Sequence, residues 1–83
     1  MQSLIAHNIS ILNYLSENIK FIRVLKELSQ EQLAEDLKVS RSRISSYEDK
    51  RAVPSIDFLI HLSEYINISM EELIKKKLNK LEV

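Results

Sequence analysis

Residues 29–51 read SQEQLAEDLKVSRSRISSYEDKR, and this stretch contains two short helical segments in close succession. Ser29 is a favourable helix N-cap, and Gln32, three residues later, can complete a capping box with it. Lys38 and Val39 form a turn. Ser40 is a second N-cap candidate, since its hydroxyl can accept from the free N–H groups of a helix start. The pattern therefore predicts a helix, a tight turn and a second helix.

Both predicted helices are amphipathic at about 100° per residue. Leu33, Ala34 and Leu37 form the apolar stripe of the first helix. The second helix spans about residues 41–48, and its apolar side consists of Ile44 and Tyr47. These stripes are expected to pack the two helices on a common core.

The outward face of the second helix is small and polar. Ser42, Ser46 and Asp49 point away from the apolar side, and Ser45 lies nearby. Arg41 and Arg43 flank this face at the N-terminus of the helix. Serines allow a helix to approach a surface closely, and arginines can reach guanine edges or phosphates. A helix of this kind is suited to the major groove of DNA.

These residues resemble the helix-turn-helix domain of the XRE family, the phage repressor and Cro type. The matching pattern is LSQEQLAEDLKVSRSRISSYEDKRAVPS followed by LIHLSEYINISMEELI, and the resemblance covers residues 17–74. It implies an all-α, five-helix repressor-like domain, with the helix-turn-helix formed by the second and third helices. It also implies sequence-specific binding of double-stranded DNA.

The resemblance assigns two kinds of DNA contact. The expected base-proximal residues are Arg41, Ser42, Arg43 and Ser46. The expected phosphate contacts are Ser29, Gln30, Ser40, Ser45, Lys50 and Arg51. Phosphate contacts position a protein without reading sequence. The alternatives are a solvated helix face for the first group, and plain capping residues and a solvated loop for the second.

Two further features follow from the resemblance. Arg23 and Glu48 match a family pair that implies a partly buried ion pair, the alternative being two independent surface charges. Many relatives have glycine where Lys38 and Lys50 stand. Such positions often need φ > 0, which costs a residue with a side chain about 1 kcal/mol each. This departure bears on the docking angle more than on the fold.

The remaining sequence also indicates helices, since there is no glycine, one proline at position 54, and mostly helical apolar spacing. A first core helix is expected at about residues 16–28, a fourth at 55–65 and a fifth from Ser69, with Glu72 completing a capping box. The residues expected inward in the first helix are Ile19, Ile22 and Leu25, with Phe21 and Val24 as further candidates. Those in the fourth and fifth are Ile56, Leu59, Ile60, Leu62, Met70, Leu73, Ile74 and Leu78.

Residues 1–15 lie outside the family core, and residues 16–83 form the expected DNA-binding domain. Apolar residues recur in the extension at helix-compatible spacing, at Leu4, Ile5, Ile9, Leu12 and Leu15. They predict an extra N-terminal helix, although asparagines and β-branched isoleucines weaken that prediction. Such an extension either packs on its own core or contributes to a dimer contact.

Composition limits the classes of function. The 83 residues fit one small domain, and no cysteine is present for a disulfide or a thiolate–metal site. No apolar run approaches a membrane span and no secretory signal is evident, so a cytoplasmic location is expected. His7 and His61 are isolated, and no catalytic motif appears, so no metal, cofactor or enzyme activity is expected.

The net charge is zero, with 12 basic and 12 acidic side chains. Residues 38–51, however, contain five basic and two acidic side chains, a local charge of +3. The expected function is a transcriptional regulator, a repressor that binds a palindromic operator as a homodimer. The alternative is an antitoxin or protein-interaction module on the same fold, with a toxin or another protein as partner and weak or secondary DNA binding. The neutral charge and apolar N-terminus favour the alternative somewhat.

Overall fold

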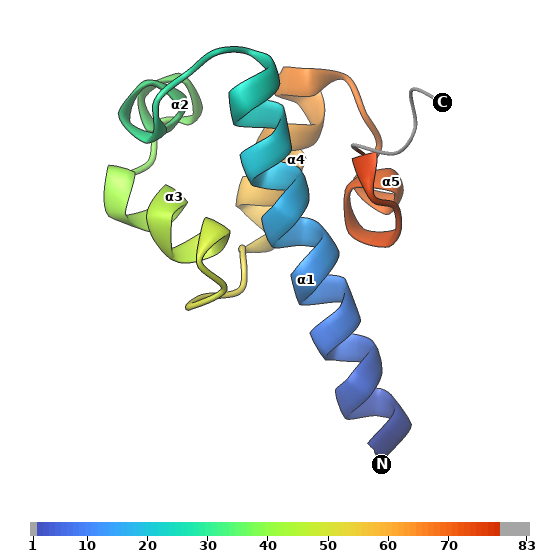
Figure 1. Cartoon of the computed structure of the whole chain (residues 1–83). Helices are drawn as coiled ribbons and strands as arrows, with labels where there is room; N and C mark the ends of the chain where they lie inside the picture. The colour runs from blue at the N-terminus through green and yellow to red at the C-terminus, as the bar shows by residue number, and fades with distance from the viewer. Residues whose placement is uncertain (1, 79–83) are drawn as a thin grey trace.

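The computed structural model describes the backbone of residues 2–78 and the side chains of residues 14–78. Within this part of the chain there are five helices and no strand, which confirms the predicted all-α class. The helices are α1 (Gln2–Leu25), α2 (Gln30–Leu37), α3 (Arg41–Glu48), α4 (Ile56–Ile66) and α5 (Met70–Lys75). As Figure 1 shows, α1 passes between the α2–α3 pair and α5, and it contacts both α3 and α5.

The N-terminal extension continues into the first core helix, so α1 is one helix of 24 residues. Its N-terminal half projects away from the other four helices (Figure 1). The helix ends at Leu25, three residues before the expected position. There Glu27 adopts a left-handed conformation (φ 57°), and the N–H of Leu28 donates to the carbonyl of Arg23 at 3.0 Å. This six-to-one hydrogen bond is the usual way for a left-handed residue to close a helix.

The core lies where α1, α2, α3 and α4 meet, and α5 closes one side. Its buried residues are Leu15, Ile19, Ile22, Leu33, Ala34, Leu37, Ile44, Tyr47, Phe58, Leu59, Leu62, Leu73 and Leu78. All the apolar residues predicted inward in α2 and α3 are among them. The rings of Tyr47 and Phe58 pack edge to face with centroids 4.7 Å apart, an arrangement that aromatic pairs favour.

Four residues predicted inward, or named as candidates, are exposed. Leu25 and Val24 lie in the last turn of α1, which ends three residues earlier than expected, and they are 62% and 56% exposed. Ile56 and Ile60 are 64% and 39% exposed. The buried side of α4 is centred on Phe58, Leu59 and Leu62 because the Phe58 ring packs on Tyr47, and this turns both isoleucines outward.

Asn18 of α1 holds the end of α5 through three hydrogen bonds, a role that the apolar pattern does not reveal. Its Nδ2 donates to the carbonyls of Leu73 (2.7 Å) and Lys76 (2.6 Å), and its Oδ1 accepts from the N–H of Leu78 (3.0 Å). The side chain is 1% exposed. Asn18 therefore satisfies main-chain groups that the end of a helix leaves without partners.

Ser69 caps α5 as predicted, accepting from the N–H of Glu72 at 3.1 Å. The reciprocal half of the predicted capping box differs, because the Glu72 carboxylate accepts from the Ser69 hydroxyl (3.3 Å). Among the described helices, none combines the length and the apolar character needed to cross a bilayer.

Candidate nucleic-acid interface

The α2–α3 turn is fixed by side-chain caps at both helix starts. Ser29 Oγ accepts from the N–H of Gln32 (3.1 Å), and Gln32 Oε1 accepts from the N–H of Ser29 (2.8 Å), which completes the predicted capping box. Ser40 Oγ caps α3 by accepting from the N–H of Arg43 (3.2 Å). Between them, Lys38 adopts the left-handed conformation at φ 60° and ψ 43°. The two caps and the left-handed residue between them thus fix the orientation of α3 relative to α2.

The outer face of α3 presents the four residues predicted to lie near bases. Arg41, Ser42 and Arg43 are exposed, and Ser46 is half-buried one turn further along the helix. Ile44 and Tyr47 anchor the opposite side in the core, with 0% and 3% of their surface exposed. Neither arginine has an ion-pair partner among residues 14–78, so both guanidinium groups are available to an acceptor from outside.

Arg23 and Glu48 form a bidentate ion pair between α1 and the end of α3. Arg23 Nε lies 2.7 Å from Glu48 Oε2, and Arg23 Nη2 lies 3.1 Å from Glu48 Oε1. The two side chains are 15% and 3% exposed. The hydrogen bond to Glu48 raises the pKa of the Arg23 guanidinium, against the opposing effect of desolvation. A third donor to Glu48 comes from Gln30.

Gln30 connects the start of α2 to this ion pair. Its Nε2 donates to Glu48 Oε1 at 3.1 Å. A side-chain amide has two donor hydrogens, so this bond leaves one for a phosphate oxygen. Ser29 is exposed next to it. The first turn of α2 is therefore held against the last turn of α3, and its free N–H groups form a surface that favours anions.

The loop after α3 contains Lys50 and Arg51. Lys50 is exposed and has a left-handed backbone (φ 64°). Arg51 Nη2 donates to Ser45 Oγ (3.1 Å) and to Asp49 Oδ2 (3.3 Å). Arg51 and Asp49 are 62% and 60% exposed, and such a pair adds little stability. The pair instead positions Arg51: the Asp49 carboxylate and the Ser45 hydroxyl both hold its guanidinium beside α3.

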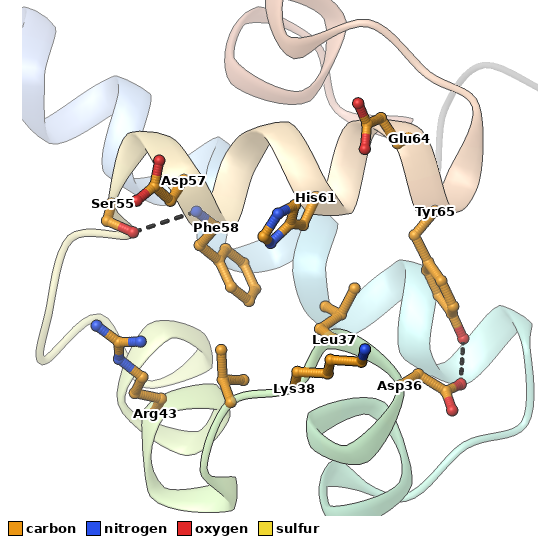
Figure 2. A pocket seen from close by; sticks show the side chains of 11 residues that line it. Asp36, Leu37, Lys38, Arg43, Ser55, Asp57, Phe58, His61, Glu64 and Tyr65 are labelled. Atoms are coloured by element: carbon orange, nitrogen blue, oxygen red, sulfur yellow. Dashed lines mark hydrogen bonds between the residues drawn. The ribbon is translucent and has the colours of Figure 1, made fainter.

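A groove of about 650 Å³ lies between the α2–α3 turn and α4 (Figure 2). Across it, the Tyr65 hydroxyl donates to Asp36 Oδ2 at 2.6 Å. Desolvation and this hydrogen bond to a carboxylate raise the pKa of Tyr65 to about 12. The other charged residues of the groove are of both signs. Within residues 14–78, no three potential ligands come together to hold a metal ion.

The structure brings the predicted residues into one region. Ser42 and Ser46 lie on the outer side of α3 with Arg41 and Arg43 flanking it, while Gln30 and Arg51 contact the last turns of the helix. The sequence pattern does not reveal that Gln30 bonds to Glu48. Nor does it single out Val53 in the α3–α4 loop, which is 72% exposed beside Ser46. The proline that follows Val53 was the only signal for this geometry.

Comparison with known proteins gives consistent results. Residues 16–79 match the helix-turn-helix domain family. The HTH-type transcriptional activator BcrR of Enterococcus faecalis is 37% identical over 59 residues, which are 71% of this chain and 29% of that protein. The HTH-type transcriptional regulator YqaE of Bacillus subtilis is 32% identical over 65 residues, 78% of this chain and 56% of that protein. The chain thus spans less than a third of the first relative and slightly more than half of the second.

Two other matches extend over more of the matched protein. Control protein C.SmaI of Serratia marcescens is 36% identical over 63 residues, 76% of this chain and 75% of that protein. The solution structure of the SOS-response transcriptional repressor LexA from Eubacterium rectale superposes with a TM-score of 0.74 at 26% identity, covering 87% of this chain and 74% of that one. The family match covers most of the chain, so this protein belongs to the XRE-type helix-turn-helix family.

Proposed function

We propose that this protein is a transcriptional regulator that binds double-stranded DNA in a sequence-specific manner, with α3 in the major groove. The observation that carries the proposal is the outer face of α3, where two arginines that have no ion-pair partner among residues 14–78 flank small serines on a helix fixed by the Arg23–Glu48 pair. A rigid helix presents donors to base edges without the entropic cost of ordering a loop.

The contacts divide by chemistry. Arg41 and Arg43 are assigned to base edges, where a guanidinium can donate to guanine O6 and N7. Ser42 and Ser46 allow close approach and can donate to either kind of acceptor. The phosphate contacts are assigned to the residues around this face, namely Ser29, Gln30, Ser40, Ser45, Lys50 and Arg51. They set the register of α3 on the duplex.

We further propose a homodimer on a palindromic operator, acting as a repressor. The eight residues of α3 span only about 12 Å, which limits one domain to a few base pairs. Two copies on half-sites about one helical turn apart supply the missing specificity. The dimer contact is assigned to α5 or to the projecting N-terminal half of α1 (Figure 1). Repression requires only that the bound dimer occupies the operator.

The test begins with selection of bound duplexes from a random pool, followed by affinity measurements on the selected sequence. Arg41→Ala should relax the preference at one position, with a loss of about 1–3 kcal/mol for the preferred base. Lys50→Ala should weaken all sequences alike and reduce the salt dependence by about one unit of slope. Lys20→Ala, which changes an exposed lysine in the C-terminal half of α1, is the matched control. Unchanged binding in both Arg41→Ala and Lys50→Ala would refute this docking.

A second candidate is an antitoxin or protein-interaction module. The projecting half of α1 favours it, because that segment offers a surface beyond the DNA-binding core (Figure 1). The zero net charge also limits non-specific attraction to DNA. Recovery of no preferred sequence from the random pool would favour this second function over the first.

A further inference from the structure

A shallow hollow of about 330 Å³ lies beside α3 on the side of the α3–α4 loop. Ser42, Arg43 and Ser46 line it from the helix, and Ala52 and Val53 line it from the loop. Val53 is 72% exposed, more than any other large apolar side chain within residues 14–78. A single exposed valine is ordinary on a protein surface. Its position next to the base-reading face of the proposed interface is the unusual feature.

The loop holds Val53 in place. The N–H of Arg51 donates to the carbonyl of Ser46 at 2.8 Å, which fixes the start of the loop against α3. Pro54 is buried and follows Val53 directly. A proline restricts the preceding residue to extended conformations, so Val53 cannot fold back into a helical turn. Val53 is thus anchored on both sides and presented beside Ser46 without being packed in the core.

The chemistry of the major groove contains one apolar feature, the C5 methyl group of thymine. The hydroxyls of Ser42 and Ser46 and the guanidinium of Arg43 can meet polar base edges, but they offer no apolar partner to this methyl. We propose that Val53 contacts the C5 methyl of one thymine in each half-site. The inference rests on the proposed function. It adds a loop residue to the side chains of α3 that contact bases.

The experiment uses the full chain and the operator obtained by selection, with each thymine replaced in turn by deoxyuridine. This replacement removes the methyl and keeps every hydrogen-bonding group of the base. One thymine per half-site should show a loss of about fourfold in affinity, the value of one buried methyl-sized group. Replacement of thymines elsewhere in the half-site should cost less.

Val53→Thr tests whether the valine is the partner. Threonine has nearly the same shape, and the position is exposed, so the fold should be retained. Val53→Thr should bind the normal operator about fourfold more weakly, and the sensitive thymine should then tolerate deoxyuridine without further loss. Val24→Thr, the same change at an exposed position on α1, is the matched control and should retain the deoxyuridine penalty.

Each result decides the inference. It is overturned if no thymine is sensitive to deoxyuridine, or if the penalty is the same in Val53→Thr as in the unaltered chain. Those outcomes leave the proposed function intact, because the operator is still bound. Failure to select any operator would instead refute sequence-specific binding, and the contact with it.

Discussion

The Arg23–Glu48 pair should show an asymmetric cost when either partner is neutralised. Arg23→Met leaves the Glu48 carboxylate, which is 3% exposed, with Gln30 as its remaining side-chain donor. Breaking a buried ion pair in this way costs about 3–5 kcal/mol. Glu48→Gln leaves Arg23, which is 15% exposed and still donates to the Leu28 carbonyl at 2.9 Å. This variant should lose only about 1–3 kcal/mol.

Urea unfolding followed by circular dichroism gives these free energies of unfolding directly. For a domain of this size, about 3 kcal/mol corresponds to a fall in Tm of roughly 12–24 °C. The double variant Arg23→Met/Glu48→Gln should be more stable than Arg23→Met alone, because no buried charge remains. Arg51→Met, which breaks the exposed pair with Asp49, is the control and should change stability by less than about 1 kcal/mol.

Two results would contradict the reasoning. One is a loss below about 1 kcal/mol in Arg23→Met, which would mean that the Glu48 carboxylate reaches solvent when its partner is removed. The other is an Arg23→Met variant no less stable than Glu48→Gln, which would remove the argument from unequal burial.

Two other predictions concern single side chains. Asn18→Ala should lower the free energy of unfolding by at least about 2 kcal/mol in urea, since three main-chain groups lose their partner; stability equal to the unaltered chain would contradict this. The pKa of Tyr65 is raised to about 12 in the folded chain, against about 10 when unfolded. The stability that the protonated Tyr65 hydroxyl contributes should therefore be complete below pH 10 and disappear as the pH rises towards 12. Tyr65→Phe should abolish this part of the alkaline decline, and an unchanged pH profile would exclude Tyr65 as its source.

Local signals predicted the helices well because capping and apolar spacing act within a few residues. Ser29, Ser40 and Ser69 all cap the helices expected of them. The wrong predictions concern side chains whose direction depends on contacts with a neighbouring helix. The direction in which Ile56 and Ile60 point depends on the packing of Phe58 against Tyr47, and sequence spacing alone does not contain that contact.

The same distinction applies to the candidate site. That Ser42 and Ser46 share one face, with Arg41 and Arg43 flanking it, follows from helical geometry, and the exposure of Arg41, Ser42 and Arg43 agrees with it. Contacts between segments far apart in the chain are harder to foresee. The apolar spacing of α1 gives no reason for Asn18 to point at α5, and nothing in the first turn of α2 indicates that Gln30 bonds to Glu48.

The left-handed residues of this glycine-free chain have a consequence for how the domain responds to salt. Lys38 and Lys50 occupy conformations that a glycine would adopt without strain, at a cost of about 1 kcal/mol each. A glycine, however, has no charge to offer. In the proposed complex, Lys50 neutralises a phosphate and thereby releases a condensed counterion, which strengthens binding most at low ionic strength. The turn after α3 thus exchanges folding stability for salt-dependent affinity, and replacing Lys50 with glycine would shift that balance in the opposite direction.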